Sequence, residues 1–233
     1  MKVAVLVSGQ PRFLRASGYR SIKEKVLDKY DCDVFCHFWW SPDGGTYDSA
    51  PWSGVVNLPI SPTAESDIIE LYNPKKTKWH LPVDPKSITK TYPRTTSPTT
   101  WVNLPCLYFS MQESYKLMVE YIKETGTKYD WVIRLRYDAI LTSFPDLTKL
   151  PKGFLYDCDY SQFHNSLANN GLIMSPEISE IIMNMHDYMD EMYNLGSLFN
   201  DEQLITTLVI SKKIPFTILS KDQFYIDLCR KDD

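Results

Sequence analysis

Two arginines and one aspartate occupy alternating positions in an otherwise apolar part of the chain. The segment Tyr129 to Leu141 is predicted as a buried central strand, and Arg134, Arg136 and Asp138 interrupt it. Side chains two residues apart lie on the same face of a strand, so the three charged groups are expected to converge. Because buried charge is costly, such residues are expected where the strand reaches a functional edge.

These three groups suit a ligand that contains phosphate. Guanidinium groups bind phosphate oxygens through paired N–H donors. A carboxylate is a hard oxygen ligand and suits a divalent cation, Mg²⁺ or Mn²⁺, that bridges a diphosphate. We therefore predict that Arg134 and Arg136 contact a diphosphate and that Asp138 is its metal ligand. The alternative is an internal ion pair between arginine and aspartate.

A second pair of acids, Asp157 and Asp159, is the rival metal motif. It follows a short predicted strand, Gly153 to Tyr156, in a polar stretch where solvated acids are common. His164 is a further candidate metal ligand or substrate contact. The other histidines lack the paired spacing of a zinc site and are expected to be structural or at the surface: His37, His80 and His186.

The elements that position these residues begin with a predicted βαβ unit. The apolar run Val3 to Val7 predicts a first strand, which leads into the loop Ser8 to Arg12. A helix from about Gly18 to Lys29 and a second strand, Asp33 to Trp39, follow. Ligands bind outside the carboxyl ends of such strands, so the first loop is expected to contact the diphosphate, with Arg12 on phosphate.

The rest of the chain continues the same alternation. The loop Trp40 to Pro62 is expected to be ordered, and the loop Leu81 to Leu104 is expected to form a lid or acceptor rim. Further helices are predicted at Thr63 to Tyr72, Pro105 to Thr125, Pro176 to Tyr193 and from Asn200 or Asp201, which suit an N-cap, and further strands at Lys75 to His80, Gly171 to Met174 and Ile214 to Leu219.

These elements predict an α/β fold of three layers, with a mainly parallel central sheet flanked by helices. We expect one domain over residues 1–233, with a donor-binding half at about 1–145 and an acceptor and catalytic half at about 146–233. The 29 acidic against 25 basic residues argue against a nucleic-acid partner. The first apolar run is too short to span a membrane, and five cysteines without a zinc pattern predict reduced thiols and a cytoplasmic location.

Short motifs resemble those of the GT-A glycosyltransferases, which bind metal and nucleotide sugar through Asp-x-Asp at the end of an apolar strand. Arg136-Tyr137-Asp138 keeps the second acid and resembles the Arg-x-Arg-x-Asp variant of small microbial and viral transferases. Asn169-Asn170-Gly171 is similar to the Asn-Ser-Gly strand of glycogenin-like enzymes. Asn200-Asp201-Glu202-Gln203 is similar to their Asp-Gln-x-Leu-Leu helix start, and the motifs follow in the same order.

The resemblance implies a Rossmann-like GT-A fold and transfer of a hexosyl group from a nucleotide-diphosphate donor, with UDP favoured, to a glycan or other hydroxyl acceptor. By alignment Glu202 takes the place of the reacting acid, and Asp201 is the alternative unless it serves only as a helix cap. The residues implied in donor binding are Ser8, Gly9, Gln10, Arg12, Arg134, Arg136, Asp138, Asn170 and Gly171.

Three questions stay open at this point. An arginine in place of the first acid can neutralise phosphate directly, so dependence on Mn²⁺ or Mg²⁺ is undecided. A sugar-phosphate nucleotidyltransferase is the second enzyme class, although the loop Ser8 to Arg12 is a poor match to its glycine-rich loop. A carbohydrate-binding module without enzymatic activity is a further alternative class of protein, although such a module would have no use for convergent arginines and an aspartate.

Overall fold

A seven-stranded sheet forms the centre of the molecule. The computed structural model describes residues 1–47, 58–84, 90–95, 100–158 and 166–229. In the order in which they lie side by side, the strands are β10 (Phe216–Ile218), β8 (Leu155–Asp157), β9 (Gly171–Met174), β6 (Trp131–Arg136), β1 (Lys2–Gly9), β2 (Asp31–Trp39) and β5 (Lys76–His80).

Most strands of this sheet are parallel. β1 pairs in parallel with β2 and with β6, and β2 pairs in parallel with β5. β9 runs antiparallel to both of its neighbours, β6 and β8. The start of β9 therefore lies at the same edge as the carboxyl ends of β1 and β6. The expected α/β fold with a mainly parallel central sheet is confirmed.

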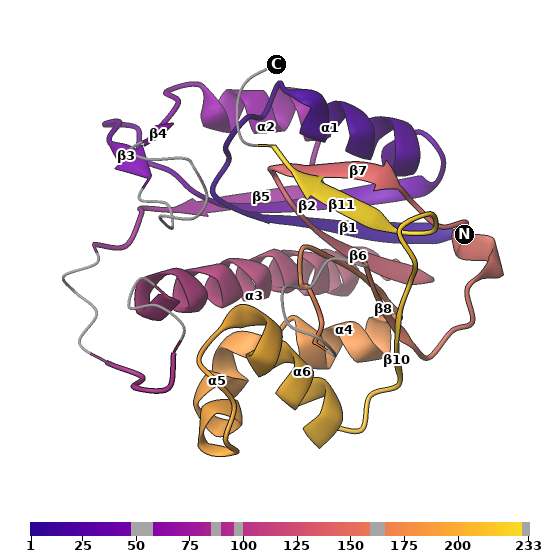
Figure 1. Cartoon of the computed structure of the whole chain (residues 1–233). Helices are drawn as coiled ribbons and strands as arrows, with labels where there is room; N and C mark the ends of the chain where they lie inside the picture. Colours follow the sequence, from indigo (N-terminus) through magenta and orange to yellow (C-terminus); the bar gives the residue numbers. More distant parts are fainter. Residues whose placement is uncertain (48–57, 85–89, 96–99, 159–165, 230–233) are drawn as a thin grey trace.

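Helices cover both faces of the sheet (Figure 1). The two helices of the N-terminal part lie on one face, and the remaining four lie on the other, which gives three layers. They are α1 (Ser17–Ile22), which continues as the π-helical η1 (Lys23–Leu27), then α2 (Ala64–Tyr72), α3 (Thr100–Thr125), α4 (Pro176–Ile182), α5 (Met185–Asn194) and α6 (Asp201–Ser211). Within the described residues, none of these helices has the length and apolarity to cross a bilayer.

Short elements complete the fold. β7 (Ala139–Ser143) pairs antiparallel with β11 (Tyr225–Leu228), and β3 (Thr46–Tyr47) pairs with β4 (Leu58–Pro59). A 3₁₀ turn, η4 (Leu147–Lys149), follows β7. The β7–β11 ribbon lies on the α1 side of the main sheet (Figure 1).

The alternation of side chains along the strands explains the two cores. In β1, Val3, Val5 and Val7 belong to the core that includes residues of α1 and α2, whereas Ala4 and Leu6 belong to the core that includes residues of α3 to α6. All five are fully buried. Because both faces are covered, the strand sequence is apolar throughout.

The predicted single strand Tyr129 to Leu141 is wrong and is two strands instead. β6 ends at Arg136, Tyr137 and Asp138 form a turn, and β7 pairs with β11 in a separate sheet. The turn packs closely on α1, because a Cβ on Gly18 would lie 3.1 Å from the Ala139 carbonyl oxygen. The alternation rule therefore applies to Arg134 and Arg136 but not to Asp138.

Two helix boundaries also differ from the prediction. The helix expected over Pro176 to Tyr193 is divided between α4 and α5, where the Asn184 amide donates to the Glu180 carbonyl at 2.6 Å and competes with the helical backbone. α3 begins at Thr100, so Pro105 lies within it rather than at its start. The helices predicted from about Gly18 and Thr63, and the strands from Asp33, Lys75, Gly171 and Ile214, are confirmed within a few residues.

Gly171 is predicted to be intolerant of any side chain. A Cβ there would overlap the Ile226 Cδ1 and would lie 3.1 Å from the Leu135 Cδ2. We expect Gly171→Ala to lower the free energy of unfolding by about 1–3 kcal/mol, as overpacking of a core does. Urea denaturation measures this cost.

Ile226→Ala provides the matched background. If the Ile226 side chain is the obstacle, the cost of Gly171→Ala should shrink in the double variant, and a thermodynamic cycle measures the coupling. Equal costs in both backgrounds would contradict this account of Gly171.

Candidate functional site

The loop after β1 brings Arg12 onto the turn after β6. β1 ends at Gly9, whose φ of +120° is accessible to glycine and strained for other residues. The Arg12 Nη2 donates to the Asp138 Oδ2 at 2.9 Å, and both side chains are buried. This contact joins two segments 126 residues apart in the chain at one edge of the sheet.

Asp138 also accepts both arms of a second guanidinium. The Arg136 Nε donates to Oδ1 at 2.7 Å and its Nη2 donates to Oδ2 at 2.8 Å, a bidentate pair. Burial lowers the pKa of Arg136, but the Asp138 carboxylate outweighs burial and raises it. Of the two arginines on Asp138, Arg136 is the more exposed, at 23% of its side chain against 9% for Arg12.

Arg134 lies deeper, on the face of β6 that packs against α3 and α6. Its side chain is fully buried. Its Nη1 donates to the backbone carbonyl and, at 3.4 Å, to the side-chain oxygen of Asn169. Its Nε and Nη2 have no hydrogen-bond partner among the described residues. Burial lowers the pKa of this guanidinium to about 10, and Asp201 is the main charge that opposes the shift.

Asp201 is the first residue of α6, and it contacts Asn169, the residue that also binds Arg134. The Asn169 Nδ2 donates to the Asp201 Oδ1 at 2.7 Å, and the hydroxyl of Tyr108 on α3 donates to the same oxygen at 2.8 Å. Burial raises the pKa of Asp201, and these two hydrogen bonds and the nearby Arg134 and Arg136 oppose the rise. The carboxylate thus lies among groups that favour its charged form.

The N-cap of α6 is Asn200, not Asp201. The Asn200 Oδ1 accepts from the backbone N–H of Gln203 at 2.8 Å. The alternative role of Asp201 as no more than a helix cap is therefore wrong. Glu202 follows in the first turn of α6 and is half-buried.

The predicted residues thus come together at one edge of the sheet in two linked chains of contacts. Arg12, Asp138 and Arg136 form the first chain, and Arg134, Asn169 and Asp201 form the second. Asp201 acts electrostatically on both Arg134 and Arg136, which links the two. The other residues predicted for this site lie on the same segments: Ser8, Gly9 and Gln10 at the end of β1, Asn170 and Gly171 at the start of β9, and Glu202 in α6.

Two contributors were not predicted. Asn169 was part of a recognised motif, but its left-handed backbone, with φ of 52°, and its contacts to Arg134 and Asp201 were not foreseen. Tyr108 appears in the sequence only as another apolar position of the α3 helix. Its full burial is consistent with that pattern, and only the position of its hydroxyl shows a further role.

The predicted site for a divalent cation, Asp138, is engaged by protein groups in this structure. Asp138 is the single carboxylate proposed as a ligand, and two guanidiniums already occupy its oxygens. Among residues that the structure describes, no group of three histidine, cysteine or acidic side chains has the arrangement of a metal site.

Asp157 of the rival acidic motif is not solvated as expected. Asp157 is the last residue of β8 and is fully buried, and it accepts from the backbone N–H groups of Cys158 and Ala168. Burial raises its pKa to about 7. It is a structural acceptor for the loop that precedes β9, whereas Asp159 and His164 lie outside the described residues.

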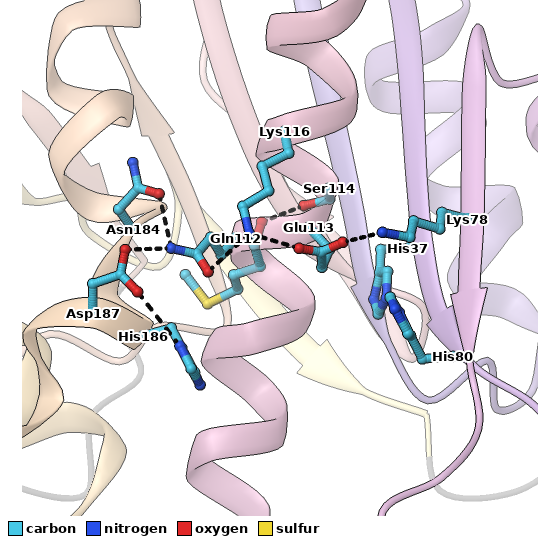
Figure 2. A network of polar contacts seen from close by, with 11 residues as sticks. His37, Lys78, His80, Gln112, Glu113, Ser114, Lys116, Asn184, His186 and Asp187 are labelled. Carbon is cyan, nitrogen blue, oxygen red and sulfur yellow. Dashed lines mark hydrogen bonds and ion pairs between the residues drawn. The ribbon is translucent and has the colours of Figure 1, made fainter.

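A second polar network connects the surface to the loop after β1, and Figure 2 shows its two histidines side by side. The backbone N–H of Gly9 donates to the Ser110 Oγ at 2.9 Å, and the His37 Nδ1 lies 2.6 Å from the same oxygen. The His37 Nε2 lies 2.8 Å from the His80 Nδ1. This pairing was not predicted, because the two histidines are 43 residues apart in sequence.

Charged side chains of α3 and β5 lie around this pair. Glu113 accepts from Lys78 at 2.6 Å and from Lys116 at 2.7 Å (Figure 2). Burial would raise the pKa of Glu113, but the two lysines prevail and lower it to about 2. Gln112 extends the network to Asp187 of α5, with its Nε2 2.6 Å from the Asp187 Oδ2.

Comparison with known proteins gives structural neighbours only. No protein-family model matches the chain, and no curated protein matches it in sequence. It is similar to the crystal structure of a glycosyltransferase involved in the glycosylation of the major capsid of PBCV-1, with a TM-score of 0.45 and 11% identity over 94% of this chain and 82% of that one. It is also similar to the glycosyltransferase GlyE of Streptococcus pneumoniae TIGR4, with a TM-score of 0.45 and 10% identity over 94% of this chain and 46% of that one.

His37 is predicted to make the fold sensitive to acid. Burial, and to a lesser degree His80, lowers the pKa of His37 to about 3, below the ordinary value of 6.5. Between these values the unfolded chain binds a proton that the folded chain does not, so stability falls as pH falls. The full slope is about 1.4 kcal/mol per pH unit.

The measurement is urea denaturation of the wild type and of His37→Asn between pH 7 and pH 4. The variant should lose less stability over this range, because it lacks the titrating ring. If stability depends on pH with the same slope in both proteins, His37 takes up its proton equally in the folded and the unfolded state, which would contradict the prediction.

Proposed function

We propose that this protein is a glycosyltransferase of the GT-A type that transfers a hexosyl group from a nucleotide-diphosphate donor, UDP being favoured, to a hydroxyl of a glycan or similar acceptor. The supporting observation is the convergence of four distant segments, Ser8 to Arg12, Arg134 to Asp138, Asn169 to Gly171 and Asp201 to Glu202, at one sheet edge. These are the segments whose sequences resemble the motifs of that family.

The charges of the site suit a diphosphate. Three guanidiniums, Arg12, Arg134 and Arg136, lie close together at this edge of the sheet. In a site largely removed from water, guanidiniums stabilise the negative charge that develops on a departing nucleoside diphosphate. Arg136 is the first candidate for direct contact because its guanidinium is the most exposed of the three.

The reaction itself requires few groups. The bond between the sugar C1 and the diphosphate oxygen breaks, the acceptor oxygen bonds to C1, and the acceptor hydroxyl gives its proton to a general base or to the departing diphosphate. In this proposal guanidiniums assist the leaving group, and a carboxylate near the start of α6 interacts with the sugar or the acceptor. The predicted cytoplasmic location belongs to the same proposal.

Arg136→Ala tests the donor site. Loss of a bidentate guanidinium should weaken binding of UDP by about ten- to hundredfold, which corresponds to roughly 1.5–3 kcal/mol for a hydrogen bond to a charged group. Calorimetric titration with UDP measures the affinity. Arg15→Ala is the matched control, because Arg15 lies three residues beyond Arg12 and binds Asp67 and Glu70 at the surface.

Turnover decides between enzyme classes. Incubation with a panel of nucleotide sugars should release nucleoside diphosphate in the presence of an acceptor or water. Release of pyrophosphate from a nucleoside triphosphate and a sugar phosphate would instead identify a nucleotidyltransferase. Binding of glycans with neither activity would identify a binding module and refute the proposal.

Asp138→Asn tests the predicted metal. The amide keeps the shape of the side chain but removes the charge that holds Arg12 and Arg136, so the two guanidiniums gain freedom to bind phosphate. We expect wild-type protein to bind UDP in EDTA, and the variant to bind at least as tightly under the same conditions. The variant should also be less stable, because breaking a buried pair costs about 3–5 kcal/mol.

The opposite pattern would support a cation on Asp138. In that case UDP would bind only with Mn²⁺ or Mg²⁺, and Asp138→Asn would lose this dependence together with affinity. Circular dichroism of both proteins establishes that the variant is folded before titration.

A further inference from the structure

The carboxylate of Asp201 is held at one oxygen only. Tyr108 and Asn169 both donate to Oδ1, at 2.8 and 2.7 Å. The described residues direct no hydrogen bond to Oδ2. The residue is only partly buried, and Oδ2 is the oxygen that neither Tyr108 nor Asn169 contacts.

Both donors are themselves fixed. The Tyr108 ring is fully buried on α3, and its hydroxyl also donates to the backbone carbonyl of Asp201 at 3.0 Å. Asn169 is 1% exposed, and its carbonyl and side-chain oxygens accept from the buried Arg134. Rigid donors fix the direction in which Oδ2 points, as a preorganised site requires.

Glu202 differs from its neighbour. Successive residues of an α-helix point about 100° apart around the axis, so Glu202 cannot share the direction of Asp201. The hydrogen bonds of Tyr108 and Asn169 both go to Asp201. They distinguish Asp201 from Glu202 as the acid that this site orients.

We infer that Asp201 is the carboxylate that this site presents to the sugar or acceptor, and that Tyr108 and Asn169 are positioning residues that orient it and keep it ionised. The inference rests on the proposed function and adds to it the identity of the acid and of the two groups behind it.

The pKa of Asp201 gives a test that does not depend on activity. Hydrogen bonds to the charged form lower the pKa of a carboxyl group, so Tyr108→Phe and Asn169→Gly should each raise the pKa of Asp201. Carbon-13 NMR of labelled aspartate carboxyl groups measures it, with Asp201→Asn to assign the resonance. Glycine at position 169 retains access to the left-handed backbone, so the second variant adds no backbone strain, and circular dichroism establishes that each variant is folded.

Matched controls make the same changes elsewhere. Tyr121→Phe alters another tyrosine of α3, which packs against Phe35. Asn73→Gly alters another asparagine with a left-handed backbone, φ of 42°, at the end of α2. Neither should move the resonance of Asp201. An unchanged pKa in both Tyr108→Phe and Asn169→Gly would overturn the positioning roles.

Kinetics test the identity of the acid. Asp201→Asn should abolish transfer and lower it far more than Glu202→Gln, and Tyr108→Phe should lower kcat roughly ten- to hundredfold and move the acidic limb of the pH profile upward. Full activity of Asp201→Asn with loss in Glu202→Gln would overturn the inference while the proposed function stands. A shifted pKa in a protein that turns over no nucleotide sugar would refute the function and leave the positioning roles intact.

Discussion

The carboxylate of Asp138, between Arg12 and Arg136, is the interaction on which this edge of the sheet depends. A buried ion pair needs well-formed hydrogen bonds to offset its desolvation, and here three short bonds converge on two oxygens. The pair fixes the loop after β1 against the turn after β6. It also fixes where β6 ends, because Asp138 lies in the turn that sends the chain out of the main sheet into β7.

Helix α3 relates this edge to the rest of the molecule. It packs on β1, β2 and β5, and two of its residues, Tyr108 and Ser110, contact segments of the candidate site. Ser110 accepts from the backbone of Gly9, Tyr108 donates to Asp201, and Glu113 binds lysines of β5 and of α3 itself. Helix α3 therefore fixes the loop after β1 and the start of α6 relative to each other. The apolar residues of α3 supply the packing, and its few polar side chains set the relative positions.

Much of this arrangement could be predicted from sequence, and the exceptions have physical reasons. Apolar periodicity predicted the strands and helices, because burial of one or both faces determines those patterns. It failed at Asp138, since nothing in the run Tyr129 to Leu141 shows that the chain changes sheets there. The motifs identified the segments that meet, but not the partners within them. Tyr108 and the pairing of His37 with His80 depend on contacts between distant parts of the chain, which no local pattern encodes.

The close contact of Gly171 with Ile226 has a consequence for how the protein is made. β11 is the last of the described strands, yet its Ile226 fills the space beside the start of β9, next to Asn169 and Asn170. Domains emerge from the ribosome from their N-terminal end, so Arg12, Arg136 and Asp201 are all synthesised before the strand that supports their edge. In the nascent chain these three charged side chains are therefore present before Ile226 can pack beside the start of β9.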